Sequence, residues 1–387
     1  MAPLLLLALL LSACATPGPP EDAAVDTDGE EADDTATAEP EDTEPEDLVE
    51  VQAGYVSGMD QMGLPAALDV GFFEEHGLDV ELAQPFPTGV DALNALQAGE
   101  VDFVQVGTPS IGAVLSGMDL VYLGNYSGSS VQKGIDETMA MVAREGSGID
   151  ADDLTTLEGK TVGVSIGSIN HLYLLGVLEE VGIDPGAVEI VNTPPPEMPV
   201  AIQTGGLDAI VVWDPWPIVT INDVEGAYEV SRGGGYISYI SYIGYVVALR
   251  DFVEDNPDIV ERLLAARAEA DQWMRENPEE ATDVATRWLP GTDPEVAEEA
   301  MQYNVVQLDP RFSACNYLAL HVDQELLLEV GAIDDVYDVN DHFVPEHILS
   351  VMETYPEFFD DLEEIPEAAQ IGPDYLFDAE EAEAACA

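Results

Sequence analysis

The stretch Val162–His171, VGVSIGSINH, carries the signal that decides the fold. Its apolar, β-branched start predicts a short buried strand, and Gly167 and Ser168 then form a turn that opens a helix. We expect this helix, HLYLLGVLEEVG, to be amphipathic. The first turn of a helix offers free backbone N–H groups and a partial positive charge, which together favour an anion. Gly167 and Ser168 are therefore candidate ligand contacts, and an ordinary serine N-cap is the alternative interpretation.

The alternation of strand and helix continues on both sides of this stretch. Strand patterns such as LVEVQAGYV (48–56) are followed by helical patterns such as PAALDVGFFEEHG (65–77), as far as about Leu249. This order predicts an α/β fold with mostly parallel sheets, and 387 residues suit two domains. The chain then becomes mostly helical to about Phe377. In open parallel sheets, ligands bind beyond the carboxyl ends of the strands.

The charge balance excludes one large class of partners. The chain has 78 Asp and Glu against 10 Lys and Arg, a formal net charge of −68. Nucleic acid is excluded as a partner because phosphate binding needs clustered cations. A uniformly acidic surface suits a halophile, since concentrated salt screens the self-repulsion.

The first 47 residues predict an anchor and a tether. MAPLLLLALLLSAC contains an apolar run, Leu4–Leu11, that is too short to span a bilayer. Its end, LSAC, resembles the lipobox of bacterial lipoproteins, in which Cys14 takes the lipid; an ordinary cleaved signal peptide is the alternative. Residues 15–47 lack aromatic residues and cations, so they are expected to form a disordered acidic tether. The resulting prediction is a protein held on the outer face of the cell membrane, or in the periplasm.

Several blocks of the sequence resemble the periplasmic binding proteins for aliphatic sulfonates, taurine and nitrate. They are ALDVGFFEEHGLDVEL, ALNALQAGEVDFVQVGTPS, DLTTLEGKTVGVSIGSINHLYLL, AIQTGGLDAIVVWDPW and FVEDNPDIVERLLAA, in the family's order between about Val49 and Ala285. The resemblance implies a type II periplasmic-binding-protein clamshell of two lobes. Lobe 1 is expected at 48–137 plus 244–387 and lobe 2 at 138–243, with a hinge near 138–143 and 242–248. It also implies a monomer that passes a small molecule to the permease of an ABC importer.

The candidate ligand-binding residues lie in the loops that follow the predicted strands or at the second hinge. They are Gln61, Met62, Thr88, Gly107, Thr108, Asn125, Tyr126, Gly167, Ser168, His171, Trp213, Asp214 and Tyr242. Trp213 can stack on a ligand or pack in the core. Asp214 can hold a ligand amine or cap the helix that Pro215 begins. Among the few cations, only Lys133 and Arg232 stand near these loops.

The sequence leaves three chemical classes of ligand open. A sulfonate or taurine is our first hypothesis, a thiamine-precursor pyrimidine or another heteroaromatic the second, and nitrate the third. A pyrimidine-synthase-like enzyme is disfavoured, because the cysteine-rich motif of those relatives is missing and no nucleophile–base set, metal-ligand spacing or cofactor motif is found. A sensor lipoprotein is a further alternative. Cys315 and Cys386 can form a disulfide, which their spacing alone does not decide.

Overall fold

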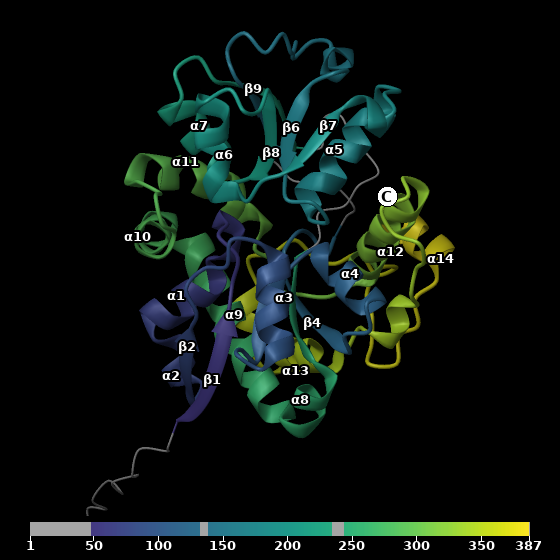
Figure 1. Cartoon of the computed structure of the whole chain (residues 1–387). Coiled ribbons are helices and arrows are strands. Elements are labelled where there is room, and N and C mark those ends of the chain that lie inside the picture. The colour runs from purple at the N-terminus through teal and green to yellow at the C-terminus, as the bar shows by residue number, and fades with distance from the viewer. Residues whose placement is uncertain (1–47, 132–137, 234–243, 387) are drawn as a thin grey trace, which may run out of the picture. The chain divides into compact units, whose positions relative to one another are not determined.

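This computed structural model describes residues 48–131, 138–233 and 244–386, and its elements are labelled in Figure 1. The predictions for residues 1–47, Cys14 among them, and those for Lys133 and Tyr242 lie outside the described residues. The body from Glu46 onward forms one compact unit. None of the described helices combines the length and apolarity needed to cross a membrane.

The first sheet has five strands in the order β2-β1-β3-β10-β4. Their bounds are β1 Val49–Gly54, β2 Leu78–Leu82, β3 Phe103–Val106, β4 Leu120–Ser127 and β10 Gly244–Leu249. β1 is parallel to β2 and to β3, with Val51 opposite Val80. β10, which comes from much later in the chain, is antiparallel to β3 and β4.

The second sheet repeats this plan in the order β7-β6-β8-β5-β9. Its strands are β5 Met139–Ala143, β6 Thr161–Val164, β7 Glu189–Asn192, β8 Ala209–Trp213 and β9 Tyr228–Arg232. β6 is parallel to β7 and β8, whereas β5 is antiparallel to β8 and β9. The predicted α/β fold with two mostly parallel sheets is confirmed. β9 was not predicted, because YEVSR has only a weak apolar alternation.

The chain passes between the sheets twice, after β4 and after β9. β4 ends at Ser127 and β5 begins at Met139, while β9 ends at Arg232 and β10 begins at Gly244, so each change of sheet occurs next to a range predicted for the hinge. The strands predicted as hinge segments belong wholly to one sheet each, β5 to the second and β10 to the first.

Helices flank both sheets. Helices α5, α6 and α7 pack on the second sheet, and α3, α9 and α13 are among those on the first (Figure 1). The α-helices are α1 Gly63–Val70, α2 Phe72–Glu75, α3 Gly89–Ala98, α4 Pro109–Leu115, α5 Ile169–Glu180, α6 Met198–Gln203, α7 Trp216–Asp223, α8 Arg250–Asp255, α9 Pro257–Glu276, α10 Pro278–Trp288, α11 Pro294–Asn304, α12 Ala314–Glu329, α13 Glu346–Thr354 and α14 Ala379–Ala385. The 3₁₀ helices are η1 Met59–Gln61, η2 Leu154–Leu157, η3 Pro185–Ala187, η4 Pro195–Glu197, η6 Val305–Gln307, η7 Val339–Asp341 and η8 Pro356–Phe359.

Two expectations about helices are wrong. α5 is not amphipathic, because nine of its twelve residues are buried. The region between η8 and α14 is mostly irregular rather than helical. α11 contacts both η1, which follows the first strand, and α7 of the second sheet, so it joins the two halves of the body.

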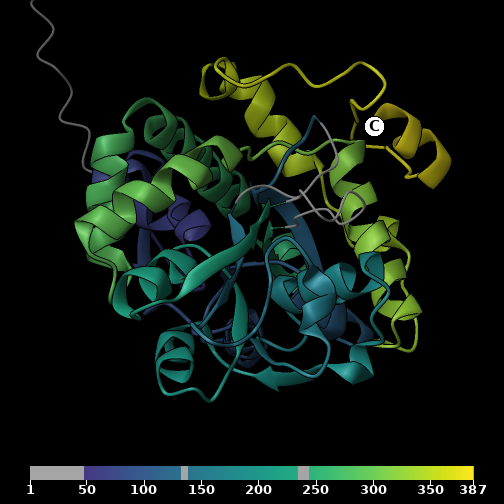
Figure 2. The same ribbon diagram turned by 90° about the horizontal axis from the view of Figure 1, so that it is seen from above.

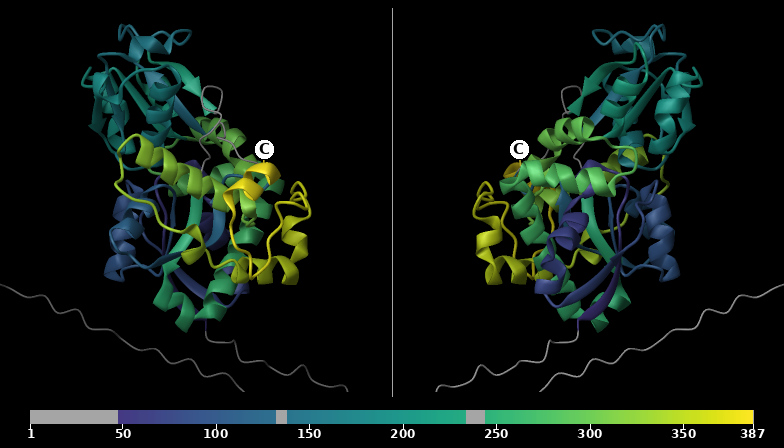
Figure 3. Two further views of the ribbon diagram at one scale, coloured as in Figure 1. Left: turned by 90° about the vertical axis from the view of Figure 1, so that its right-hand side faces the viewer. Right: turned by 90° about the vertical axis from the view of Figure 1, so that its left-hand side faces the viewer.

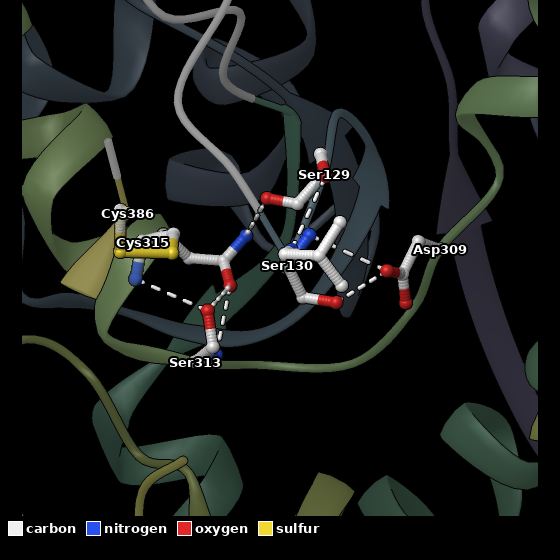
Figure 4. Close-up of a disulfide and its surroundings, with 8 residues drawn as sticks. Ser129, Ser130, Asp309, Ser313, Cys315 and Cys386 are labelled. Carbon is white, nitrogen blue, oxygen red and sulfur yellow. Dashed lines mark hydrogen bonds between the residues drawn. A yellow bond between two sulfur atoms is a disulfide. The ribbon is translucent and has the colours of Figure 1, made fainter. Parts of the chain in front are cut away.

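A disulfide joins Cys315 to Cys386, with 5.5 Å between their Cα atoms. It ties the first turn of α12 to the end of α14, and Figures 2 and 3 show these two helices side by side. In Figure 4 the same turn lies next to the chain that leaves β4: the side chain of Asn316 donates to the Ser129 carbonyl, and the Ser130 hydroxyl donates to Asp309. The disulfide therefore fixes α12, and the first turn of α12 holds the chain just after β4.

Candidate functional site

A small cavity lies where the loops after several strands meet. Its volume is about 20 Å³, enough for roughly one water molecule. From the part of the chain that forms the first sheet come Val56, Asp60, Gln61, Gly89, Val106, Gly107, Pro109 and Tyr126; from the part that forms the second come Ser168, Ile169 and Trp213. The structure thus brings five predicted ligand residues together, namely Gln61, Gly107, Tyr126, Ser168 and Trp213.

Gln61 is held in the cavity wall by a chain of hydrogen bonds. Its side-chain oxygen accepts from the backbone N–H of Val56 at 3.2 Å, and the side chain of Gln105 donates to the Gln61 carbonyl at 2.8 Å. Arg267 Nε donates to Gln105 Oε1 at 2.6 Å. Sequence reasoning missed Gln105 and Arg267, although a glutamine inside the apolar strand VDFVQVG is a usable signal.

Arg267 is 1% exposed and serves as a buried anchor behind the cavity. It forms a 2.8 Å ion pair with Asp271 on the next turn of α9, and it donates to the backbone carbonyls of Asn125 and Tyr126. Burial raises the pKa of Asp271 to about 6, in spite of Arg267. Asn125, a predicted ligand contact, does not line the cavity, and its side chain donates to the Asp309 carbonyl at 3.0 Å.

The residues at the start of α5 line two separate hollows. Ser168 is the N-cap of α5 and lines the cavity, but its side chain makes no capping hydrogen bond, so the interpretation as an ordinary side-chain cap is wrong. Gly167, with a left-handed φ of 83°, lines a separate hollow beside α3 and α4. The Gly167 N–H donates to His171 Nδ1 at 3.3 Å, and burial lowers the pKa of His171. His171 therefore acts as a neutral acceptor there.

Both tryptophans of VWDPW bond to one carbonyl across the site. Trp213 Nε1 and Trp216 Nε1 donate to the Ser57 oxygen at 2.9 and 3.0 Å. The backbone N–H of Met59 also donates to the Asp214 carbonyl at 2.9 Å. Only Trp213 of the two lines the cavity. The loop after β1 and the loop after β8 are thus in direct contact.

Asp214 lies in an ion pair instead of facing the cavity. Its carboxylate is fully buried and pairs with Arg232 at 3.0 Å, and Asn304 of α11 donates to it at 3.3 Å. The Arg232 guanidinium also lies 4.5 Å from the ring centre of Tyr303. The capping alternative is wrong, since α7 has Pro215 as its N-cap and no side-chain capping bond.

The remaining predicted contacts do not line the cavity. Met62 is completely buried in the core, and Thr88 caps α3 by accepting from the Asp91 N–H. Thr108 lies between two lining residues; it is 1% exposed, and its hydroxyl has no hydrogen-bond partner among the described residues.

The chemistry of the cavity is acidic and aromatic. The described residues that line it include the carboxylate of Asp60, the rings of Tyr126 and Trp213, an amide and a hydroxyl, and no Lys or Arg. Over the described residues, no group of three or more His, Cys, Asp or Glu is placed to hold a metal ion. These residues offer polar and aromatic contacts to a small molecule.

Comparison with known proteins gives a family match and several relatives of this chain. The sequence model of the NMT1-like family matches residues 44–289. A binding protein of Brucella abortus is 27% identical over 63% of this chain and 72% of its own length. The taurine-binding periplasmic protein of Escherichia coli is 27% identical over 55% of this chain and 63% of its own length. These relatives confirm the prediction of a binding protein rather than an enzyme.

One solved structure supports the fold. The crystal structure of the periplasmic aliphatic sulphonate binding protein SsuA from Escherichia coli matches 76% of this chain and 91% of its own, at 22% identity and a TM-score of 0.62. At that identity the likeness concerns the fold alone. The two-sheet body described above is therefore the fold of a periplasmic binding protein.

Proposed function

Because this chain belongs to the NMT1-like family, we propose that it is the substrate-binding protein of an ABC importer and captures an aliphatic sulfonate or taurine. One observation carries the proposal: a single cavity is lined by loop and strand-end residues from both sheets, including Gln61, Tyr126, Ser168 and Trp213. A ligand between two domains is the common arrangement for small-molecule sites. In this proposal the first sheet belongs to lobe 1 and the second to lobe 2.

The start of α5 supports an acidic ligand group. Ser168 lines the cavity, and its hydroxyl is not used to cap the helix. The first backbone N–H groups of a helix have no partner within the helix and carry a partial positive charge. A sulfonate oxygen bound there needs no lysine, which suits a cavity without cations among its described residues.

Ligand entry requires the two halves to separate. A space of about 20 Å³ holds roughly one water, so a molecule as large as taurine fits only if the loops after β1 and β8 move apart. Three hydrogen bonds join these loops, two of them at the Ser57 carbonyl. We propose that the two halves hinge where the chain changes from one sheet to the other, near 138–143 and 242–248, with closure biased by ligand contacts on both sides.

A heteroaromatic ligand is the second candidate, and a specific observation favours it. The rings of Tyr126 and Trp213 both line the cavity, and such rings stack on flat ligands. A thiamine-precursor pyrimidine would use these faces. Nitrate is the third candidate, and it gains least from the two rings.

A thermal-shift screen in concentrated salt tests the function. The protein from Leu48 onward is heated with alkanesulfonates, taurine, nitrate, bicarbonate, thiamine and its pyrimidine. A ligand at about a hundred times its dissociation constant stabilises by roughly 2.7 kcal/mol, which is easily detected. Shifts with sulfonates or taurine support the proposal, shifts only with a heteroaromatic support the second candidate, and a folded protein that responds to none contradicts both.

The anchor is a separate proposal. We propose that Cys14 carries a lipid that holds the protein outside the cytoplasm next to its permease, with residues 15–47 as the tether. Cells fed a labelled fatty acid should label the wild type but not Cys14→Ser, and the variant should leave the membrane fraction. Equal labelling of both would contradict the proposal.

A further inference from the structure

We propose that Arg267 and Gln105 are positioning residues that fix the orientation of the Gln61 amide, so that Gln61 presents N–H donors to the cavity and selects a ligand group that accepts hydrogen bonds. The inference rests on the proposed function and adds residues that set its specificity. Gln61 lines the cavity from η1, the short turn after β1. A glutamine side chain has a donor end and an acceptor end, so its orientation decides which of them a ligand meets.

The orientation of the Gln105 amide follows from Arg267. A guanidinium carries donors only, so the atom of Gln105 that lies 2.6 Å from Arg267 Nε is the amide oxygen. The amide nitrogen of Gln105 then faces Gln61, where it donates to the backbone carbonyl at 2.8 Å and to the side-chain oxygen at 3.2 Å. The reverse orientation would place donor against donor at Arg267 and oxygen against oxygen at Gln61.

The side chain of Gln61 is fixed by two donors. Its oxygen accepts from Gln105 and also from the backbone N–H of Val56 at 3.2 Å, and a backbone N–H can only donate. Its nitrogen makes no hydrogen bond with any of the described residues. The N–H groups of Gln61 are therefore the end of the amide that remains for a ligand in the cavity.

Arg267 has this effect without giving the cavity a net positive charge. It forms a 2.8 Å ion pair with Asp271, and it donates to the backbone carbonyls of Asn125 and Tyr126. Tyr126 also lines the cavity, so one guanidinium supports lining residues on β4 directly and on η1 through Gln105. This needs the planar fork of an arginine, which the single ammonium group of a lysine lacks.

Hydrogen exchange tests the orientation without any ligand. In the full-length protein with ¹⁵N-labelled glutamine, nuclear magnetic resonance follows the side-chain NH₂ groups, and the Gln61 signal is the one lost in Gln61→Met. We expect the Gln61 protons to exchange quickly with water and the Gln105 protons slowly. In Gln105→Glu the carboxylate still accepts from Arg267 but cannot donate, so the Gln61 NH₂ should turn towards it and exchange about ten-fold more slowly.

Calorimetry with ethanesulfonate tests the consequence for binding. Gln61→Met removes the donors without adding charge and should weaken binding by about 10- to 100-fold, the loss expected for one hydrogen bond to a charged group. Gln105→Glu should cause a similar loss. In the double variant the two losses should not add, because both act through the same N–H groups. Gln203→Glu makes the same charge change at an exposed position of α6 and should leave binding unchanged.

The outcomes separate this inference from the proposed function. Slow exchange of the Gln61 NH₂ protons in the wild type overturns the orientation, and this result stands even if Gln105→Glu does not fold. Losses of affinity that add fully in the double variant show that Gln105→Glu acts by its charge alone, and they overturn the role of Gln105. If the folded wild type binds none of the ligands in the thermal-shift screen, the proposed function fails, and the exchange rates still decide the orientation of Gln61.

Discussion

Asp214 illustrates how single charged residues are used in this molecule. Its carboxylate is completely buried, and both its oxygens lie within hydrogen-bond distance of Arg232 Nη1. Asn304 of α11 adds a further hydrogen bond, and Tyr303 of the same helix stacks on Arg232. The pair therefore links the end of the second sheet to the C-terminal helices, which makes it a structural element between the two halves.

Replacing Asp214 by Ala should cost stability rather than ligand selectivity. The substitution takes Asp214 away from the largely buried Arg232, which keeps its ion pair with Glu229. Removing one partner of a buried pair costs about 3–5 kcal/mol, which denaturant unfolding in concentrated salt will measure. Asp208→Ala, in a more exposed pair with Arg144, is the matched control and should cost less. Unchanged stability together with selective loss of amine ligands would instead make Asp214 the amine partner.

His171 makes stability depend on pH. The unfolded chain protonates this histidine near its ordinary pKa of 6.5, whereas burial lowers the pKa in the folded protein. Below pH 6.5 the unfolded state binds more protons, so the free energy of unfolding falls as the pH falls towards the folded pKa. His171→Gln should remove this loss, and melting temperatures from pH 7.5 to pH 5 will show it. If the melting temperatures of the wild type and the variant fell equally with pH, His171 would not be the cause of the pH dependence.

Among the elements, α12 and α14 depend on each other through the disulfide. α14 has seven residues, which is too short for an isolated helix to be stable in water. Packing against α12 and the bond from Cys386 to Cys315 keep it in place. The same first turn of α12 has a capping box between Ser313 and Asn316, and Asn316 reaches the Ser129 carbonyl after β4. The first turn of α12 therefore links the disulfide to the chain that leaves the first sheet.

Breaking the disulfide should destabilise the protein. The bridge spans 71 residues, and the entropy of a loop that long corresponds to about 4 kcal/mol. Reductant, or the double variant Cys315→Ser with Cys386→Ser, should lower the free energy of unfolding by a similar amount, which denaturant unfolding will show as a lower midpoint. The double variant treated with reductant is the control and should not change further. A wild-type midpoint that reductant does not move would show that the bridge does not form.

For the whole molecule, the excess of negative charge makes stability depend on salt. A net charge of −68 makes the folded surface repel itself, and low salt leaves this repulsion unscreened. The Debye length falls from about 10 Å at 0.1 M salt to about 3 Å at 1 M. We expect the melting temperature to rise steeply over this range. Sucrose, which is uncharged, is the control for general solvent effects, and a flat salt dependence would contradict the predicted halophilic adaptation.

Much of the fold could be predicted from local patterns. Short apolar strands, Thr88 and Gly99 at the ends of α3, and the prolines that open α9 and α10 all act within a few residues, so the sequence shows them directly. The family blocks then indicated two mostly parallel sheets. α5 was misjudged because its outer side is covered by other parts of the chain, and helical periodicity does not report what lies opposite a helix.

The cavity is less visible in the sequence. The loops that line it could be predicted, because strand ends meet at one edge of a parallel sheet. The sequence alone therefore determined the family, the two-sheet fold and the acidic, cation-poor character of the site. Only the tertiary structure decided that Asp60 lines the cavity while Asp214 pairs with Arg232, that Arg267 supports Gln61 from α9, and that Cys315 meets Cys386. The Asp214–Arg232 ion pair, the disulfide and the Arg267–Gln105 hydrogen bond join residues 18 to 162 positions apart. Such partners are chosen by packing in three dimensions, which no local pattern of residues encodes.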